Sequence, residues 1–468
     1  MKIIRVFFIL GFFALLLLPI LTLNRDEDAV SEIDNKKLAQ NPLDVRSNGG
    51  DFSDAVEAYI SERLGFRNCM IKCYTSVNDV LFNEMVHPSY SYGKDGYVFS
   101  KYTENKTYGE YEDEFVDFLV KMQDYCQSRE IGFVFVFEPS KAAILSDKLP
   151  DGYNYSGEWY EELLSRLDEN NVNYVDNSKI LSECYSNGIS VFNVKYNAGH
   201  WNDMGAFYGM NEVLKNLHSK GFNVHINYLE EYSQTSKLNT TLPVSEFPIS
   251  EYETIMNLKN TESIINITSK YEKEIKIDSR YPYFLYLINE ERIEEGAPKT
   301  LVFQGSYING FGYKFLQNGL GEYIAVHDYQ NVIGFEYYIN LFQPECVIFD
   351  AAEYTFKDSY FDLQQMKQVN PTPPLRSFSN YKELELYGDI VINKKEATTE
   401  IQLQELEVPV DYVYLIINET EYSMEKESIN NGLQFNYCVT VDNNAYNNDI
   451  EIIAVNESEE LIYYVIFD

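Results

Sequence analysis

Hydrophobic residues follow two alternating patterns through most of the chain. Runs in which apolar residues recur every three or four positions, as on one face of a helix, are followed by short runs that are apolar throughout. The clearest pair is a helix through Phe115, Leu119 and Met122, followed by a buried strand over 131–137. Alternation of this kind predicts an α/β fold with a mostly parallel sheet and helices on both faces.

The same alternation continues towards the C-terminus. A helix through Trp159 precedes a strand at 171–176, and a third helix starts after Trp201 and ends near Gly221. Strands are expected at 300–303, 322–328 and 345–352, with helices between them. Residues 226–295 show no regular period and are expected to be irregular.

The two ends of the chain have different patterns. Phe52, Val56, Ile60 and Leu64 mark an amphipathic helix that ends at Gly65, a second helix runs to about residue 82, and 92–100 is typical of a hairpin. After the proline-rich segment 371–375 come five short alternating runs without helical period, which predict a small β-sandwich. The expected organisation is an anchor at 1–25, a stalk at 26–50, a main α/β domain at 51–370 and a β-sandwich at 376–468.

The N-terminus has the composition of a membrane-spanning helix. Lys2 and Arg5 precede 18 uncharged residues, from Val6 to Leu23, and acidic residues follow. This length suffices to cross a bilayer core of roughly 30 Å, and the basic residues on its N-terminal side place the bulk of the chain outside the cytoplasm. We therefore expect a single-pass membrane protein with an uncleaved signal anchor; a cleaved signal peptide is the alternative.

Charge and cysteine content exclude several classes of function. Acidic residues outnumber basic ones by 73 to 37, a formal charge of −36, so nucleic acid is not an expected partner. The six cysteines form no CxxC pair and no cluster with histidine, so mostly free thiols are expected and neither a metal nor a cofactor is.

Ser306 is the first candidate for chemistry, because it follows a predicted strand at 300–303 and a glycine, Gly305. Ligands of open α/β sheets bind at the carboxyl ends of strands. A serine nucleophile needs a base, and of the five histidines His200 lies in a turn before a predicted helix. His327 also follows a strand, whereas His87 and His218 are expected to face solvent. Asn202 or Asp203 is explained as the N-cap of the helix.

Five segments, in this order along the chain, together resemble the alginate O-acetyltransferase group, the AlgX/AlgJ type of SGNH hydrolase-like domain. They are "ERLGFRN" (62–68), "GKDGYVF" (93–99), "FVFEPSKAAILSDKLP" (135–150), "HWNDMGA" (200–206) and "VIFDAAEYT" (347–355), with the Gly-Ser after a strand falling between the last two. The resemblance covers about residues 50–360.

The resemblance implies a serine that accepts an acetyl group and passes it to a polysaccharide hydroxyl. Ser306 matches the nucleophile and His200 the general base, with the oxyanion stabilised around Gly305 and Tyr307 and by Asn309. It also implies a separate membrane protein as acyl donor, because acetyl-CoA is cytoplasmic.

The chain departs from the family pattern at two positions. Where the family has Asp-x-His, this chain has Ala198-Gly199-His200, so the orienting carboxylate is absent from its usual place. Asn197 is expected to hold the imidazole through its amide oxygen instead. Where the family has Gly-Asp-Ser, this chain has Gln304-Gly305-Ser306.

Three functions therefore stay open. The first is a membrane-anchored O-acetyltransferase of a cell-surface polysaccharide or exopolysaccharide. The second is an inactive or weakly active relative that serves as envelope scaffold or glycan-binding protein, which the altered aspartate positions favour. The third is a carbohydrate esterase with the same Ser306 and His200. The C-terminal β-sandwich is a candidate carbohydrate-binding module by the same resemblance, and Glu353 and Lys141 are expected to be capping or solvated groups.

Overall fold

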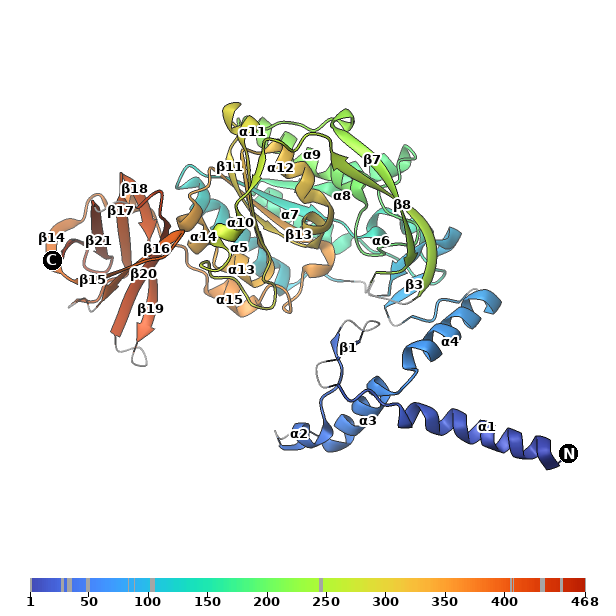
Figure 1. The fold of residues 1–468 in the computed structure, drawn as a ribbon. Coiled ribbons are helices and arrows are strands. Elements are labelled where there is room, and N and C mark those ends of the chain that lie inside the picture. The colour runs from blue at the N-terminus through green and yellow to red at the C-terminus, as the bar shows by residue number, and fades with distance from the viewer. Residues whose placement is uncertain are drawn as a thin grey trace.

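A computed structural model describes residues 2–26, 29–31, 36–47, 51–82, 84–87, 89–101, 106–243, 247–404, 406, 408–429, 434–446 and 449–467. An α/β body lies between an N-terminal helical segment and a C-terminal pair of β-sheets (Figure 1). The two ends of the chain lie far apart, on opposite sides of the body.

The central sheet has seven strands in the order β6-β5-β13-β11-β12-β10-β9. In this order the strands are Tyr174–Asp176, Gly132–Glu138, Cys346–Ala352, Lys299–Gln304, Glu322–His327, Phe284–Asn289 and Ile264–Asn266. The four pairings from β6 to β12 are parallel, and β10 pairs antiparallel with both β12 and β9. The carboxyl ends of β5, β13, β11 and β12 therefore meet at one edge of the sheet.

Both faces of this sheet are covered by helices, as the apolar strands require. In β5, Phe133, Phe135 and Phe137 pack on one face and Val134 and Val136 on the other. The first face is covered by α5 (Glu110–Gln127), α7 (Glu158–Glu169), α13 (Tyr329–Ile333), α14 (Phe335–Phe342) and α15 (Leu363–Gln368). The second is covered by α6 (Lys141–Ile144), α8 (Asn177–Ser186), α9 (Asp203–Ser219) and α12 (Tyr313–Gly319).

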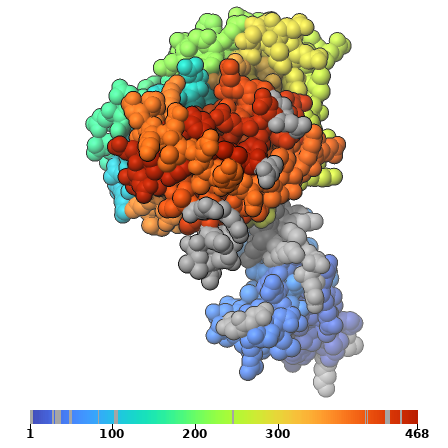
Figure 2. Space-filling view, turned by 90° about the vertical axis from the view of Figure 1, so that its left-hand side faces the viewer, coloured from blue at the N-terminus to red at the C-terminus, as the bar shows by residue number. Residues whose placement is uncertain are grey.

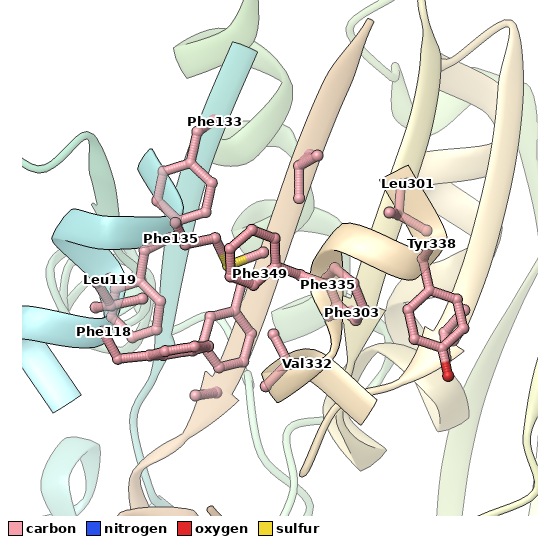
Figure 3. Packing of buried hydrophobic residues seen from close by; sticks show 14 of the residues in the cluster. Phe118, Leu119, Phe133, Phe135, Leu301, Phe303, Val332, Phe335, Tyr338 and Phe349 are labelled. Carbon is pink, nitrogen blue, oxygen red and sulfur yellow. The ribbon is translucent and has the colours of Figure 1, made fainter. Parts of the chain in front are cut away.

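The first face holds a dense aromatic core. Phe135 and Phe349 come from neighbouring strands, with ring centroids 5.6 Å apart, and Phe118 of α5 packs edge-on against Phe349 (Figure 3). Such edge-to-face pairs add to the free energy gained by burying the rings. This core fixes the strands whose ends carry the candidate site.

Residues 226–295, expected to be irregular, contain regular structure. Besides β9 and β10 they form a two-stranded hairpin of β7 (Tyr232–Thr241) and β8 (Pro248–Leu258), with the short helices α10 (Thr268–Tyr271) and α11 (Glu290–Glu294). The hairpin is mostly exposed and polar on its outer side, so the sequence has no hydrophobic period strong enough to show it.

In the described residues after 380, nine strands form two sheets, β14-β22-β21-β17-β18 and β15-β16-β20-β19. They are β14 Lys382–Tyr387, β15 Asp389–Lys394, β16 Thr398–Gln404, β17 Tyr412–Ile417, β18 Thr420–Ser423, β19 Glu425–Ile429, β20 Gln434–Asp442, β21 Ile450–Asn456 and β22 Leu461–Ile466. Apolar side chains of both sheets share one core, for example Val413 and Leu415 of one sheet with Ile401 and Val439 of the other. Viewed from their side, these residues cover one face of the molecule, and the N-terminal segment lies below (Figure 2).

The N-terminal segment contains α1 (Lys2–Leu21), α2 (Pro42–Ser47), α3 (Phe52–Arg63) and α4 (Arg67–Phe82), and the two-residue strands β1 (Val30–Ser31) and β2 (Lys36–Lys37). Among the described residues, α1 is the one helix long and apolar enough to cross a membrane, a test that a signal sequence also passes. The expected stalk is tied to α3, because the Arg63 guanidinium donates to the carbonyls of Asp26 and Ala39. The remaining hairpin, β3 (Tyr90–Tyr92) with β4 (Val98–Ser100), lies where the sequence predicts one.

Candidate functional site

Ser306 lies at a sharp turn between a strand and a helix. Strand β11 ends at Gln304, and helical backbone starts at Ser306 and continues through a π-helical turn, Ile308–Gly312, into α12. A side chain at Gly305 would place its Cβ 3.3 Å from Asp328 Oδ2 and 3.4 Å from Asp350 Oδ2, which is tighter than most such contacts. Glycine therefore lets the chain pass close to these carboxyl groups, and the helix that follows directs Ser306 out of the sheet edge.

His200 comes from a separate segment, the loop 193–201 that precedes α9. Asn202 is the N-cap of α9, and its side chain accepts a hydrogen bond of 3.0 Å from the Gly205 N–H, as the sequence predicts. Trp201 is fully buried, and its Nε1–H donates to the Tyr307 carbonyl at 3.1 Å. The hydroxyl of Tyr307, in turn, contacts the Gly199 carbonyl. These contacts hold the residues on either side of His200 against the residue after Ser306.

The structure brings together the nucleophile, base and orienter that the sequence suggests. His200 Nε2 lies 2.7 Å from Ser306 Oγ, and His200 Nδ1 lies 2.8 Å from Asn197 Oδ1. A Ser306 hydroxyl that donates to Nε2 requires the imidazole proton on Nδ1, which then donates to the Asn197 amide oxygen. The three side chains thus form a Ser-His-Asn chain of hydrogen bonds in which the imidazole has the tautomer of a general base.

The backbone conformation of Asn197 places its side chain beside His200. Asn197 has a φ of 57°, in the left-handed region that asparagine tolerates better than most residues. Ala198 is buried in an apolar cluster with Met85, Val98 and Leu242. A carboxylate at 198 would have to displace this packing, whereas the side chain of Asn197 lies within hydrogen-bond distance of His200.

Burial decides the protonation state of His200. Loss of solvent lowers the pKa of the imidazole from 6.5 to about 4. At neutral pH His200 is therefore unprotonated and ready to accept the serine proton. The Ser-His-Asp arrangement also places a negative charge beside the imidazolium that forms during the reaction, whereas Asn197 offers only a dipole.

Tyr354 is a neighbour of the nucleophile that the sequence does not single out. Its hydroxyl lies 2.7 Å from Ser306 Oγ, and burial raises the pKa of the phenol to about 12, so the group is neutral at pH 7 and can donate to Ser306. The signal was present in the sequence, since Tyr354 follows β13 by two residues and so falls at the same sheet edge as Ser306.

The backbone donors expected around Ser306 are partly used elsewhere. The Gly305 N–H donates to Asp350 Oδ2 at 3.1 Å, and the Asn309 N–H donates to the Gly305 carbonyl at 3.0 Å. Neither of these two N–H groups is therefore free for an oxyanion. Because Tyr307 lies in the first turn of the helix, its N–H has no intrahelical acceptor and stays a candidate, as does the side-chain amide of Asn309.

Three buried carboxyl groups lie beneath the turn, at the ends of β5, β13 and β12. They belong to Glu138, Asp350 and Asp328, and none is accessible to solvent. Burial raises the pKa of all three, and the negative charge of a neighbouring carboxyl adds to this for Glu138 and Asp350. His327 Nδ1 approaches Asp328 Oδ1 to 3.0 Å, but the geometry is not that of a hydrogen bond. In the described part of the chain, no group of three or more histidine, cysteine, aspartate or glutamate side chains is arranged to hold a metal ion.

The other residues that the sequence singles out lie as follows. His218 is exposed, whereas His87, expected to face solvent, is buried and stacks on Tyr90 with ring centroids 4.7 Å apart. Glu353 accepts from the Ser140 N–H and from the Tyr155 hydroxyl, both at 2.7 Å, which is a capping role. Lys141 is fully buried and donates to three backbone carbonyls, so it is a capping group without solvent contact.

The six cysteines are all free, with Cys69 and Cys73 exposed on α4 and four buried. Mostly free thiols are expected from the sequence, and Cys69 and Cys73 are the two that solvent reaches.

No protein-family model matches the chain, and no curated protein matches it. Among solved structures, it is similar to Bacillus cereus PatB1 with a sulfonyl adduct, at 16% identity and a TM-score of 0.45, over 57% of this chain and 95% of that one. It is also similar to the O-acetyltransferase domain of Pseudomonas putida AlgJ, at 15% identity and a TM-score of 0.41, over 60% and 98% of the two chains. A third similar structure is Pseudomonas aeruginosa AlgX, at 13% identity and a TM-score of 0.38, over 78% and 93% of the two chains.

Proposed function

We propose that the protein is an O-acetyltransferase in which Ser306 carries the acetyl group between a donor and a polysaccharide hydroxyl. The observation that supports this most strongly is the contact of 2.7 Å between Ser306 Oγ and His200 Nε2, with Asn197 on the other imidazole nitrogen. An imidazole kept neutral by burial and a serine at the end of a strand have the arrangement of an acyl-transfer site. The resemblance of the sequence motifs to the alginate O-acetyltransferase group implies that the acyl group is acetyl.

In the first half-reaction, Ser306 Oγ attacks the carbonyl carbon of the acetyl donor while His200 Nε2 takes the hydroxyl proton. His200 returns this proton to the leaving oxygen of the donor, and acetyl-Ser306 remains. In the second half-reaction, a sugar hydroxyl attacks this ester, its proton passes through His200 to Ser306 Oγ, and the serine is regenerated. The Tyr307 N–H and the Asn309 amide are the proposed donors to the oxyanion of each tetrahedral intermediate.

The proposal includes the setting of the reaction. Helix α1 is the proposed anchor, with the bulk of the chain outside the cytoplasm, and a membrane-bound partner supplies the acetyl group. The main α/β domain at 51–370 carries the site, and the C-terminal sheets at 376–468 are a candidate glycan-binding module. The open end of the sheet around Ser306 has to admit a polymer, which agrees with the partial exposure of Ser306 and Tyr354.

Acyl-enzyme formation tests the proposal. The full-length chain in detergent is incubated with 4-nitrophenyl acetate, and its intact mass is compared with that of the Ser306→Ala variant. We expect the mass of one acetyl group on the parent and none on the variant. Neutral oligosaccharides added to the acetylated protein then separate transfer, which yields acetylated sugar, from hydrolysis, which yields acetate and indicates an esterase. Equal mass for parent and variant, without release of nitrophenol above the variant, would contradict the proposal and favour a scaffold.

A further inference from the structure

The hairpin β7–β8 packs against the loop that carries His200. Along one side of β8, Ile249 belongs to the apolar cluster of Ala198, the Glu253 carboxylate accepts from the Asn193 side chain at 2.9 Å, and the Met256 N–H donates to Asp203 at 2.6 Å. Successive contacts of β8 therefore follow the chain from residue 193 to the start of α9. The hairpin lies outside the central sheet, and these contacts join it to the site.

Glu251 makes the most concentrated of these contacts. Its Oε1 accepts from the Val194 N–H at 2.7 Å, and its Oε2 accepts from the Lys195 N–H at 2.8 Å and the Tyr196 N–H at 2.5 Å. Three successive backbone donors thus converge on one carboxylate, as in an anion-binding turn. The next residue in the chain is Asn197, whose side chain orients His200.

Lys141 holds the same loop by its carbonyl groups. Its buried ammonium donates to the Asn193 carbonyl at 2.5 Å and to the Val194 carbonyl at 3.0 Å, and a third bond of 2.9 Å reaches Val98. The Lys141 ammonium thus binds backbone carbonyl groups of this loop, and the Glu251 carboxylate binds its backbone N–H groups. Because both kinds of backbone group are bound, the backbone that leads to Asn197 has little freedom to rotate.

We propose that Glu251 is a positioning residue, through which the β7–β8 hairpin sets the orientation of Asn197 and His200 towards Ser306. This role rests on the proposed function, because it requires that His200 is the general base. Glu251 touches neither Ser306 nor His200; it acts by keeping the loop 194–196 in one conformation, so that Asn197 holds its left-handed backbone and its amide oxygen meets His200 Nδ1. A site that is misplaced by about 1 Å loses on the order of 10²-fold in rate.

The carboxylate is needed because all three partners are donors. In Glu251→Gln one oxygen becomes an NH₂ group, which faces an N–H and repels it. The side-chain volume is nearly unchanged, so the variant weakens the contact and leaves the packing of the hairpin. Tyr252→Ala is the matched control, because Tyr252 is the adjacent residue of β8, points to the other side of the strand and is 71% exposed.

The first readout is acetylation of Ser306 by 4-nitrophenyl acetate in the full-length chain. We expect the rate to fall about 10- to 100-fold in Glu251→Gln and to stay at the parental value in Tyr252→Ala. Glu251→Asp keeps the charge but shortens the reach by one methylene, so its rate should lie between those of the parent and Glu251→Gln. It also serves as the test where Glu251→Gln fails to fold.

The second readout is the titration of the His200 ring by NMR, assigned with the variant His200→Gln, which does not depend on turnover. A loop that loosens lets water reach the imidazole, so its pKa should rise from about 4 towards 6.5 in Glu251→Gln. The groups that face the ring, Asn197, Ser306, Tyr307 and Tyr354, are unchanged in this variant. An unchanged rate and an unchanged titration would each overturn the proposal. If the parent itself does not acetylate, the proposed function fails and the titration alone decides the role of Glu251.

Discussion

Ser306 and His200 meet at one point, but two different kinds of backbone hold them there. Ser306 sits between β11 and a helix, so its position follows from residues next to it in the sequence. His200 sits in a loop whose shape depends on partners far along the chain, with Glu251 55 residues from Tyr196 and Lys141 52 residues from Asn193. The proposed nucleophile therefore has local support, whereas the proposed base has support from distant segments, and the two should respond differently to substitution.

The largest effect is expected at the contact between His200 and Ser306, where the two segments meet. His200→Ala removes the acceptor of the serine proton and should slow acetylation of Ser306 by about 10³-fold, within the usual range for a general base. A Ser306→Ala, His200→Ala double variant should be no worse than Ser306→Ala alone, because the two act as one unit.

The rate of nitrophenol release measures this loss, with His218→Ala as control, since His218 is exposed at the end of α9. Acetylation that persists at the parental rate in His200→Ala would mean that Ser306 reacts without this base and that the contact of 2.7 Å has no chemical role.

The distant support of the His200 loop is tested by Lys141→Met. The variant keeps most of the side-chain volume but leaves three buried carbonyls without their charged donor, which should reduce the free energy of unfolding by about 3 kcal/mol. Urea denaturation measures the change. Lys148→Met, which removes the partner of the exposed Asp95, should change the free energy of unfolding much less than Lys141→Met does. A similar cost for both variants would show that the buried ammonium does little for the loop.

The sequence singles out Ser306, His200 and Asn197, but it does not predict the distant contacts that support the His200 loop. The strand before Ser306 and the N-cap Asn202 both follow from neighbouring residues, and so they can be recognised without a structure. Glu251 cannot be recognised in this way, because it lies in an exposed, polar hairpin whose contacts with 194–196 arise only in the folded chain.

The strand-end carboxyl groups were missed for a related reason. Asp350 resembles an ordinary polar residue near the end of a buried strand, and only the register of β13 and β11 places it beside Gly305. Tyr354 is next to Glu353, which the sequence does single out, and only the turn after β13 decides which of the two side chains reaches Ser306.

A smaller effect should follow from restoring a carboxylate beside the base. In Asn197→Asp a negative charge replaces an amide oxygen 2.8 Å from His200 Nδ1, which favours the imidazolium and raises the pKa of His200. In the parent the base stays neutral, and acetylation proceeds, down to about pH 4, where His200 becomes protonated. In the variant the acid limb of the pH–rate profile should move up by about one to two pH units, equivalent to about 1.4 kcal/mol per unit.

The pH dependence of acetylation measures this shift, with Asn187→Asp at an exposed position after α8 as control. An acid limb at the same pH in Asn197→Asp and the parent would mean that residue 197 does not face the imidazole in solution.

The smallest effect concerns the support of Ser306 itself. The buried Asp350 carboxyl accepts from the Gly305 N–H, and its pKa is raised by burial and then by the charge of Asp328. The folded protein therefore keeps a proton that the unfolded chain loses above its ordinary pKa of about 4, so stability falls as the pH rises towards the folded-state pKa. His200 has the opposite sign: its lowered pKa makes stability rise between about pH 4 and 6.5 and contributes no slope above that range.

The variant Asp350→Asn keeps an amide oxygen that accepts from Gly305 but cannot titrate. Between pH 6.5 and 8 it should lose about 1 kcal/mol less stability than the parent. The control Asp124→Asn, on the exposed side of α5, should not differ from the parent. Urea denaturation at the two pH values measures the difference. Equal slopes for Asp350→Asn and the parent would mean that the turn at Ser306 is supported by its neighbours in the sequence alone, whereas the expected flattening would show that this turn, too, depends on a strand end 45 residues away.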